Sequence, residues 1–362
     1  MDESRADAPP RRVTLSPGET VADAARKAIA FGADALVRHQ NAAESGDAEA
    51  LHQLRVATRR LRASIELFSS VIYAAQIKFY RRDIPWIAHQ AGACRECDVT
   101  SALITARAAK IDPDLNAAIA PMIAALEQRR KSEHAKLCDL LASKRYRNLL
   151  AKLSRPAFKK LGADRRLGMV AAQLVRHATR GAARLGEKLA GDAPAPVFHK
   201  LRVRIKRLRY ELEMIAPLGA KRHKKTVARL EELQELLGLY NDTVVATAWL
   251  LSFAETAGAP PRTVLAAGAL IQSLGRRESK LRRQCIRAWR RFERSDAMRD
   301  TLEEIRRAGR LALKPVSSPT PGTGGLESDA PDKSQIPRDE PEEPPHSNHD
   351  SMNSQSATEA MP

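Results

Sequence analysis

The chain has 362 residues, of which 43% are hydrophobic and 29% are charged, enough for one large soluble domain or two modest ones. Its formal net charge of +18 predicts polyanionic partners without identifying the polyanion. The longest apolar run, residues 117–126, has 10 residues and contains Pro121, against roughly 20 for a membrane helix, so we expect no membrane insertion. Four cysteines and no apolar N-terminal segment favour the cytoplasm.

The chain is predicted to be all-α between about Ser16 and Arg310. This region is rich in Ala, Leu, Arg, Lys and Glu, and its apolar residues recur at three- and four-residue spacing. The order Ser16-Pro17-Gly18-Glu19 is typical of a capping box, so we expect a helix to start there and a second to start near Asp47. Helices are expected to end at the turn-forming sequences of residues 46–47, 112–114, 191–196, 216–220 and 257–261.

The two ends of the chain differ in composition from the helical region. Residues 1–14 are predicted to be a flexible N-terminus. Residues 315–362 contain nine prolines and nine Asp or Glu against two Lys or Arg, and cannot bury enough apolar surface to offset the entropy of ordering. We expect a disordered, Pro-rich acidic tail that aids solubility, with weak competition of the tail for the basic region as an alternative.

Two basic stretches 147 residues apart have nearly the same sequence. "LHQLRVATRRLR" (51–62) and "FHKLRVRIKRLR" (198–209) are identical at seven of twelve positions. Further pairs keep this separation to within one residue, namely Arg129-Arg130 with Arg276-Arg277, Cys138 with Cys285, and Gly92 with Gly238. The repeat predicts one duplicated domain over residues 15–312, with a first helical bundle at 15–160 and a second at 165–312.

Each copy of the repeat places its cations on one helical face. At 100° per residue, the cations of a copy lie within about 80° of one another and nearly opposite its apolar residues. We call these faces the basic stripes; they comprise His52, Arg55, Arg59 and Arg62 in the first copy and His199, Arg202, Lys206 and Arg209 in the second.

The composition of the basic stripes favours an anion supplied from outside the chain. A solvated helix face usually alternates acidic with basic residues, whereas these stripes contain no acid, so their like charges cost stability. The planar guanidinium of Arg donates two hydrogen bonds at once to phosphate oxygens. His52 and His199 stand at the head of each stripe, where a neutral imidazole can donate one hydrogen bond to phosphate. No nearby nucleophile or paired carboxylate supports a catalytic role for them.

The doubled motif, together with "AGACRECDV" (91–99) and "LLGLYNDTVV" (236–245), resembles the CHAD domain, the conserved histidine α-helical domain. The resemblance covers nearly all of residues 15–312. It implies two antiparallel four-helix bundles related by pseudo-twofold symmetry, with the basic stripes lining a shared groove or pore. It also implies binding of inorganic polyphosphate and association with polyphosphate granules in bacteria. Some relatives are fused to a triphosphate tunnel domain, but its ExExK element does not occur here.

The resemblance assigns polyphosphate binding to basic residues of both copies. Because the family has Arg-Asp where this chain has Arg95-Glu96, the longer acid changes the expected reach at that position. Asp98, Asn241 and Asp242 match the later elements. The predicted polyphosphate-binding residues are His52, Arg55, Arg59, Arg60, Arg62, Arg95, Arg130, His199, Lys200, Arg202, Lys206, Arg207, Arg209 and Arg277.

Three functions are compatible with these patterns, and we favour a non-catalytic polyphosphate-binding module without metal or cofactor. A nucleic-acid binder is an alternative, although aromatic residues are only 4% of the chain and no helix-turn-helix, zinc-finger or RNP signature is present. A phosphate-handling enzyme is less favoured, because metal sites for phosphate gather several carboxylates. Cys94 and Cys97 form a lone CxxC pair, which indicates two buried thiols rather than zinc.

Overall fold

The computed structural model describes residues 13–112, 115–215, 218, 223–255 and 258–313, and this part of the chain confirms the predicted all-α class. It contains ten helices, and its only β-pairing consists of two isolated bridges. The predicted acidic tail lies outside the described residues, as does the predicted flexible N-terminus except for its last two residues. In chain order the helices are α1 (Val21–Glu44), α2 (Ala48–Leu67), α3 (Ala74–Ile111), α4 (Leu115–Ala142), α5 (Lys144–Leu153), α6 (Leu167–Gly186), α7 (Ala195–Ile215), α8 (His223–Ala254), α9 (Pro261–Arg294) and α10 (Ala297–Leu311).

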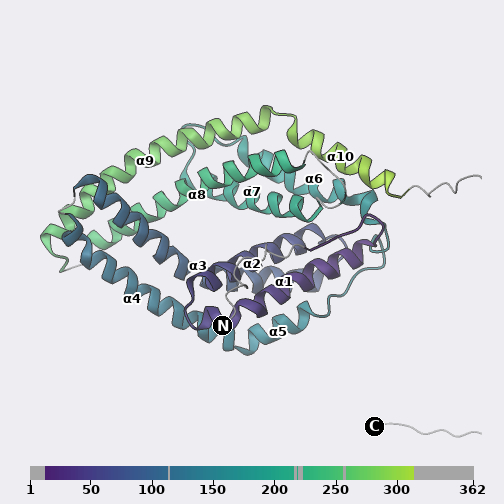
Figure 1. Ribbon diagram of the computed structural model, residues 1–362, viewed down its shortest axis with the longest axis horizontal. Helices are drawn as coiled ribbons and strands as arrows, with labels where there is room; N and C mark the ends of the chain where they lie inside the picture. The colour runs from purple at the N-terminus through teal and green to yellow at the C-terminus, as the bar shows by residue number, and fades with distance from the viewer. Residues whose placement is uncertain (1–12, 113–114, 216–217, 219–222, 256–257, 314–362) are drawn as a thin grey trace, which may run out of the picture. The chain divides into compact units, whose positions relative to one another are not determined.

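Helices that follow one another in the chain pack side by side in each half. In the first half α1 contacts α2, α2 contacts α3 and α3 contacts α4, while α5 lies against α1 and α4. In the second half α6, α7, α8 and α9 follow the same order of contacts, and α10 lies against α6 and α8 (Figure 1). Each half therefore contributes five helices, and the finer prediction of two four-helix bundles related by pseudo-twofold symmetry stays a prediction.

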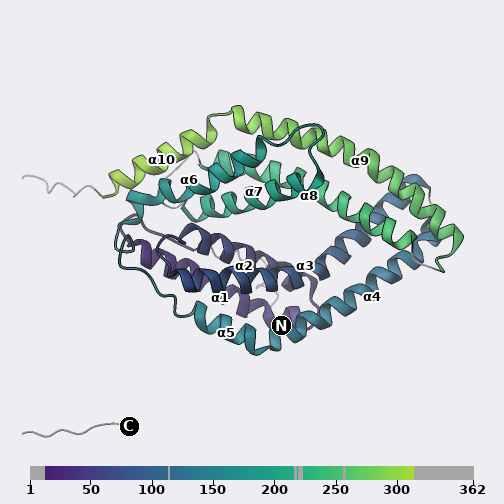
Figure 2. The same ribbon diagram turned by 180° about the vertical axis from the view of Figure 1, so that it is seen from behind.

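The two halves meet through corresponding helices. α2 contacts α7, α3 contacts α8 and α4 contacts α9, and these neighbours can be followed from both sides in Figures 1 and 2. The main apolar core includes Leu54, Leu61, Leu201 and Leu208, each 0–1% exposed, so the repeated motif supplies the centre of the core. A second apolar core joins α3, α4, α8 and α9, and its buried residues include Ile104, Met122, Leu250 and Leu270.

Residues 154–166, which we call the connector, join α5 to α6 and are fastened to the first half by backbone hydrogen bonds. The N–H of Lys159 donates to the carbonyl oxygen of Val71 at 2.8 Å, and the N–H of Val21 donates to that of Arg165 at 2.9 Å. Ordered backbone pairing of this kind satisfies polar groups that a loop would otherwise leave to water. The connector is therefore part of the packed structure of the first half.

The helix ends agree with most of the sequence predictions. Asp47 caps α2 as expected, accepting a hydrogen bond from the N–H of Ala50. The expected ends near 46–47, 112–114 and 257–261 are confirmed by the ends of α1, α3 and α8, and eight residues separate α6 from α7. The expected turn at 216–220 lies outside the described residues except for residue 218. The predicted start of the first helix is wrong. Residues 16–19 form a turn, and Thr20 caps α1 instead, with its hydroxyl accepting a hydrogen bond from the N–H of Asp23 at 3.1 Å.

Two close approaches in the second half require glycine. An added Cβ at Gly309 of α10 would lie 2.0 Å from the carbonyl oxygen of Gly168 in α6. At the other end of α6, a Cβ at Gly186 would lie 1.8 Å from the indole of Trp289 in α9. Backbone and ring occupy the space that a larger residue would need, so these glycines set how closely α6 packs against its neighbours.

Helix α8 is the one helix, in the part of the chain that the structure describes, that is long and apolar enough to cross a membrane. Its best 18-residue window has a mean hydropathy of 1.2, with 28% of that window buried. The helix packs against α3, α7, α9 and α10. Core helices of soluble proteins meet the same criterion of length and composition, so this observation alone does not favour a membrane span.

Candidate functional site

The basic stripes lie on α2 and α7, which pack against each other. The predicted apolar faces of both helices are buried, and this orientation is what turns the cations of the two helices away from the core. The cations are not fully solvated, because Arg55, Arg59, Arg202 and Lys206 are only partly exposed. The contact between α2 and α7 therefore brings partly desolvated cations of the two basic stripes close together.

Five basic residues from the two halves repel one another electrostatically. We call them the cationic cluster; they are Arg55, Arg59, Arg95, Arg202 and Lys206. Burial, followed by repulsion from Arg202, Arg59 and Arg55, lowers the pKa of Lys206 to about 6. Burial and repulsion from Arg59, Arg202 and Arg95 lower the pKa of Arg55 to about 10. Because α2 and α3 supply three members and α7 supplies two, the cluster exists only when both halves are in place.

Two of the repeated glycines lie where guanidinium groups of the cationic cluster rest on α3 and α8. A Cβ at Gly92 would lie 3.3 Å from Nη1 of Arg55, tighter than nearly all such contacts, and Nη1 donates a hydrogen bond of 3.2 Å to the carbonyl oxygen of Ala91. A Cβ at Gly238 would lie 3.7 Å from Nε of Arg202, an ordinary contact. The absence of a side chain at Gly92 thus makes room for the guanidinium of Arg55, whereas a Cβ at Gly238 would fit beside Arg202.

Hydrogen-bond donors in the cationic cluster are buried without acceptors. Nε of Arg59 and Nε of Arg202 are both inaccessible to water and have no hydrogen-bond partner. The counter-charge of Arg202 is Asp242, whose Oδ1 lies 3.9 Å from Nη2 of Arg202. Arg95 has only a long ion pair of 3.8 Å to Asp98. A buried donor without a partner costs about 1–3 kcal/mol, more when it is charged, so the cluster is chemically suited to an anion with several oxygens.

The two motif histidines lie in different environments. His52 is partly buried, and burial lowers its pKa, with Glu49 opposing and Arg59 adding to that effect. His199 is exposed, and its Nδ1 lies 2.6 Å from Oδ1 of Asn241. With that oxygen as acceptor, Nδ1 carries the proton, so the neutral imidazole has no second N–H for an anion. His199 can donate to phosphate through Nε2 only as an imidazolium.

Comparison with known proteins gives this geometry a context. The family model of the CHAD domain matches residues 27–251, more than half of the chain. The chain belongs to the CHAD domain family. A CHAD domain structure from the plant Ricinus communis matches with 25% identity and a TM-score of 0.65, covering 81% of this chain and 99% of its own. PptA from Streptomyces chartreusis has the same fold, with 19% identity and a TM-score of 0.62, covering 75% of this chain and 100% of its own. No curated protein matches the chain.

The CHAD motif residues at the C-terminal ends of the stripes lie apart from the cationic cluster. Arg209 forms ion pairs of 3.2 Å with Glu213 and 2.7 Å with Glu231. Arg207 pairs with Glu211 at 2.5 Å and with Glu66 at 3.6 Å. The stripes themselves contain no acid, but acids one turn further along α7 and on neighbouring helices neutralise the arginines at this end.

The remaining predicted residues of the CHAD domain are dispersed. Arg130 donates from Nε to Asp98 at 2.7 Å, which places it beside Arg95 at the edge of the cationic cluster. Nε of Arg277 is buried without a partner, and burial, followed by repulsion from Arg107, lowers the pKa of Arg277. The other three are a half-buried Arg60 and an exposed Arg62 and Lys200. Arg107, which lies close enough to repel Arg277, has no counterpart in the repeat, so no sequence pattern indicated it.

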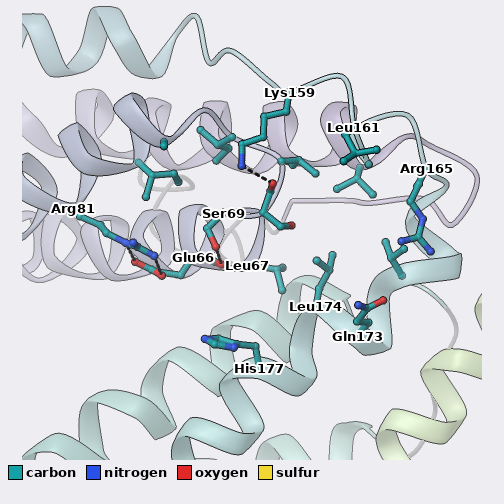
Figure 3. A pocket seen from close by; sticks show the side chains of 18 of the residues that line it. Glu66, Leu67, Ser69, Arg81, Lys159, Leu161, Arg165, Gln173, Leu174 and His177 are labelled. Atoms are coloured by element: carbon teal, nitrogen blue, oxygen red, sulfur yellow. Dashed lines mark hydrogen bonds and ion pairs between the residues drawn. The ribbon is translucent and has the colours of Figure 1, made fainter.

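A cavity of the CHAD domain lies elsewhere. It has a volume of about 920 Å³ and is lined by α2, α3, the connector and α6, including Glu66, Arg81, Lys159 and His177 (Figure 3). Arg81 forms a bidentate ion pair with Glu66, in which Nε donates to Oε1 at 2.7 Å and Nη2 donates to Oε2 at 2.8 Å. No member of the cationic cluster lines this cavity. The cationic cluster is therefore separate from this cavity.

The cysteines and acids offer little for metal chemistry. Cys94 and Cys97 are 1% and 2% exposed, which confirms two buried thiols, and burial raises the pKa of Cys94 to about 11. Among the described residues, no group of three or more His, Cys, Asp or Glu could hold a metal ion.

Proposed function

We propose that this CHAD protein binds inorganic polyphosphate at the cationic cluster, without catalysing its turnover and without a metal or cofactor. The proposal rests on one observation: partly buried cations of α2 and α7 lie where these two helices pack together. Nε of Arg59 and Nε of Arg202 lack hydrogen-bond acceptors there. A linear polymer of phosphate offers many oxygens and compact charge along one chain, so it can contact both stripes at once. The second contact is then intramolecular, which raises avidity above that of either stripe.

The family resemblance supports the same ligand and suggests a location. We propose that the protein is cytoplasmic and that polyphosphate granules recruit it through the cationic cluster. The basic composition, with a net charge of +18, increases the rate of encounter with polyanions at low salt. Membrane insertion is not part of the proposal.

The decisive experiment reverses two arginines of the cationic cluster that come from different halves. In Arg55→Glu/Arg202→Glu, we expect loss of retention on immobilised long-chain polyphosphate at moderate salt, because repulsion replaces attraction at the centre of the site. A control reverses Arg38 and Arg147, two exposed cations of α1 and α5, and should retain binding. Unchanged helicity by circular dichroism verifies folding. Undiminished retention of the first variant would contradict the proposal.

Two further measurements test the alternatives. If duplex DNA displaces polyphosphate at equal phosphate concentration, the proposed preference is wrong. If polyphosphate chains shorten in the presence of Mg²⁺ and the protein, the protein is an enzyme and the non-catalytic proposal fails.

A further inference from the structure

A second row of cations lies on the solvent face of α9. Its members recur at spacings of four, three, four, three and four residues, so they fall within about 80° of one another over a length of about 27 Å. All six are exposed. We call this row the outer stripe; it consists of Arg276, Lys280, Arg283, Arg287, Arg290 and Arg294.

The packing of α9 holds the outer stripe toward solvent. The opposite face of the helix buries Leu274, Leu281, Cys285 and Trp289 in the apolar cores. In both views α9 lies at an edge of the helical region with α8 on its inner side (Figures 1 and 2). The outer stripe is thus presented by a rigid helix that cannot rotate without exposing its core residues.

The outer stripe is not neutralised by acids of the described residues. None of its six cations forms an ion pair there, and no acid falls within the stripe. The two acids of this part of α9 lie elsewhere: Glu278 pairs with Arg282 at 4.0 Å, and Glu293 lies outside the arc of the stripe. Six like charges at this spacing repel one another, so the row costs stability in the absence of an anion.

The corresponding helix of the first half provides an internal comparison. Moving back 147 residues from Lys280 and Arg283 gives Glu133 and Lys136 of α4, which form an ion pair of 2.8 Å. Moving back the same distance from Arg287 gives Leu140, which is 5% exposed. The second half therefore has an uncompensated row where the first half has a balanced and partly buried face. The packing of the fold does not require the outer stripe.

We propose that the outer stripe binds the phosphate backbone of duplex nucleic acid, independently of sequence. A duplex carries one charge per about 1.7 Å of its axis, so a segment as long as the stripe has phosphates for all six cations. A duplex is also stiff, whereas a flexible polyphosphate would have to be ordered along a single exposed row of cations.

Two other polyanions fit the outer stripe less well. Single strands require exposed rings for base stacking, and the aromatic residues near the stripe, Trp289 and Phe292, are buried and partly buried. Anionic membranes favour apolar side chains that insert beside the cations. Within α9, all of which the structure describes, the exposed large apolar residues are Val264 and Leu265, more than ten residues before the stripe begins.

The test uses the full chain and a labelled 20-base-pair duplex of mixed sequence, with binding followed by fluorescence anisotropy between 50 and 300 mM salt. In Arg283→Gln/Arg287→Gln/Arg290→Gln we expect affinity at 100 mM salt to fall about tenfold or more. The slope of log affinity against log salt should decrease in magnitude by about 2–3, because each lost phosphate contact removes about 0.9. A control with the same loss of charge, Arg38→Gln/Lys131→Gln/Arg147→Gln, alters exposed cations of α1, α4 and α5.

The outcomes separate this proposal from polyphosphate binding at the cationic cluster. We expect the outer-stripe variant to keep its affinity for polyphosphate within about twofold, and Arg55→Glu/Arg202→Glu to keep its affinity for the duplex. Equal losses of duplex affinity in the outer-stripe variant and its control would overturn the proposal. So would a loss confined to polyphosphate, or stripe-dependent binding to phosphatidylserine vesicles without duplex binding.

Discussion

At the scale of single residues, we expect Lys206 to couple the proposed polyphosphate binding to the uptake of a proton. In the free protein, burial and the repulsion of neighbouring arginines lower its pKa to about 6, so the side chain is mostly an uncharged amine at pH 7. A bound anion favours the ammonium and raises that pKa, so binding takes up a proton above pH 6. The affinity for polyphosphate should therefore fall as the pH rises from 6 to 8.

Replacing Lys206 with Met tests this linkage. Between pH 6 and the ordinary lysine value of 10.5, the unfolded chain binds a proton that the folded protein does not, so stability of the free protein rises with pH over this window. Lys206→Met should remove that rise and increase the free energy of unfolding at pH 7 by about 1 kcal/mol or more, because folding then no longer requires a lysine to lose its proton on burial.

Urea unfolding at pH 6, 7, 8 and 9, with polyphosphate titrations at pH 6 and 8, measures both effects of Lys206→Met. Lys206→Arg is the control, because a permanently charged side chain should bind polyphosphate with little pH dependence over this range. His52 also gains charge as pH falls, so it should contribute to any slope that remains in the variants. Identical pH profiles in wild type and Lys206→Met would contradict the linkage.

Residue roles were only partly predictable from the sequence. The periodicity of "LHQLRVATRRLR" identified which cations leave the core, because a helix fixes the direction of each side chain. It could not identify the partners, because those come from elsewhere in the chain. Arg209 meets Glu231 from α8, and His199 meets Asn241, also from α8. Burial of Lys206 likewise depends on how α2 and α7 pack, which no local pattern encodes.

At the scale of elements, the close contact between α6 and α10 determines what residue 309 can be. Gly309→Ala would place a methyl group 2.0 Å from the carbonyl oxygen of Gly168, and backbone on both sides leaves no flexible group to yield. We expect it to destabilise the fold by about 2 kcal/mol or more, in the upper range of overpacked sites. Thermal unfolding followed by circular dichroism at 222 nm measures the change.

Gly275→Ala is the matched control for that substitution. Gly275 lies inside α9, and a Cβ there would meet nothing within 4 Å. Alanine should stabilise the helix by up to about 1 kcal/mol, because it loses less backbone entropy on folding than glycine does. If both substitutions shift the melting temperature in the same direction, packing at Gly309 is not the determining factor.

Helix boundaries were predictable where a single strong signal stood alone. Asp47 is followed by an uninterrupted helical pattern, and α2 begins there. At the start of α1 two signals compete, and Thr20 with Asp23 forms the cap while Ser16 with Glu19 forms only a turn. The β-bridge that joins Thr20 to Arg166, the last residue of the connector, favours the later start, and this long-range contact is not visible in local sequence.

At the scale of the whole molecule, the site depends on both halves of the repeat. Arg59 and Lys206 come from different halves, and repulsion from Arg59 helps to lower the pKa of Lys206. If one polyphosphate chain contacts both, Arg59→Gln and Lys206→Gln should be non-additive, with a coupling free energy above about 0.5 kcal/mol in binding. Isothermal titration calorimetry with polyphosphate on the wild type, both single variants and the double variant completes this double-mutant cycle. Strict additivity would indicate two independent sites.

The duplication allowed the sequence to predict that two similar stripes exist, but not how they face each other. An offset of 147 residues says nothing about which helices touch. The contact of α2 with α7 arises because Leu54 and Leu61 share a core with Leu201 and Leu208. Association of the two faces is a property of that shared core, so the geometry of the site could be learned only from the structure.

The connector gives the site one more property. Because its backbone is bonded to the first half at Val71 and at Val21, the start of α6 is held where the first half places it. A tether of free residues would let the halves drift apart, and a ligand that drew them together would lose part of its binding free energy in doing so. In this protein the cost of fixing the two halves is part of folding, so it does not reduce the binding free energy of a ligand. The distance between the two basic stripes is already fixed before a ligand binds. If polyphosphate binds as proposed, we expect the protein to discriminate by chain length, because chains too short to reach from one stripe to the other would make a single contact and dissociate quickly.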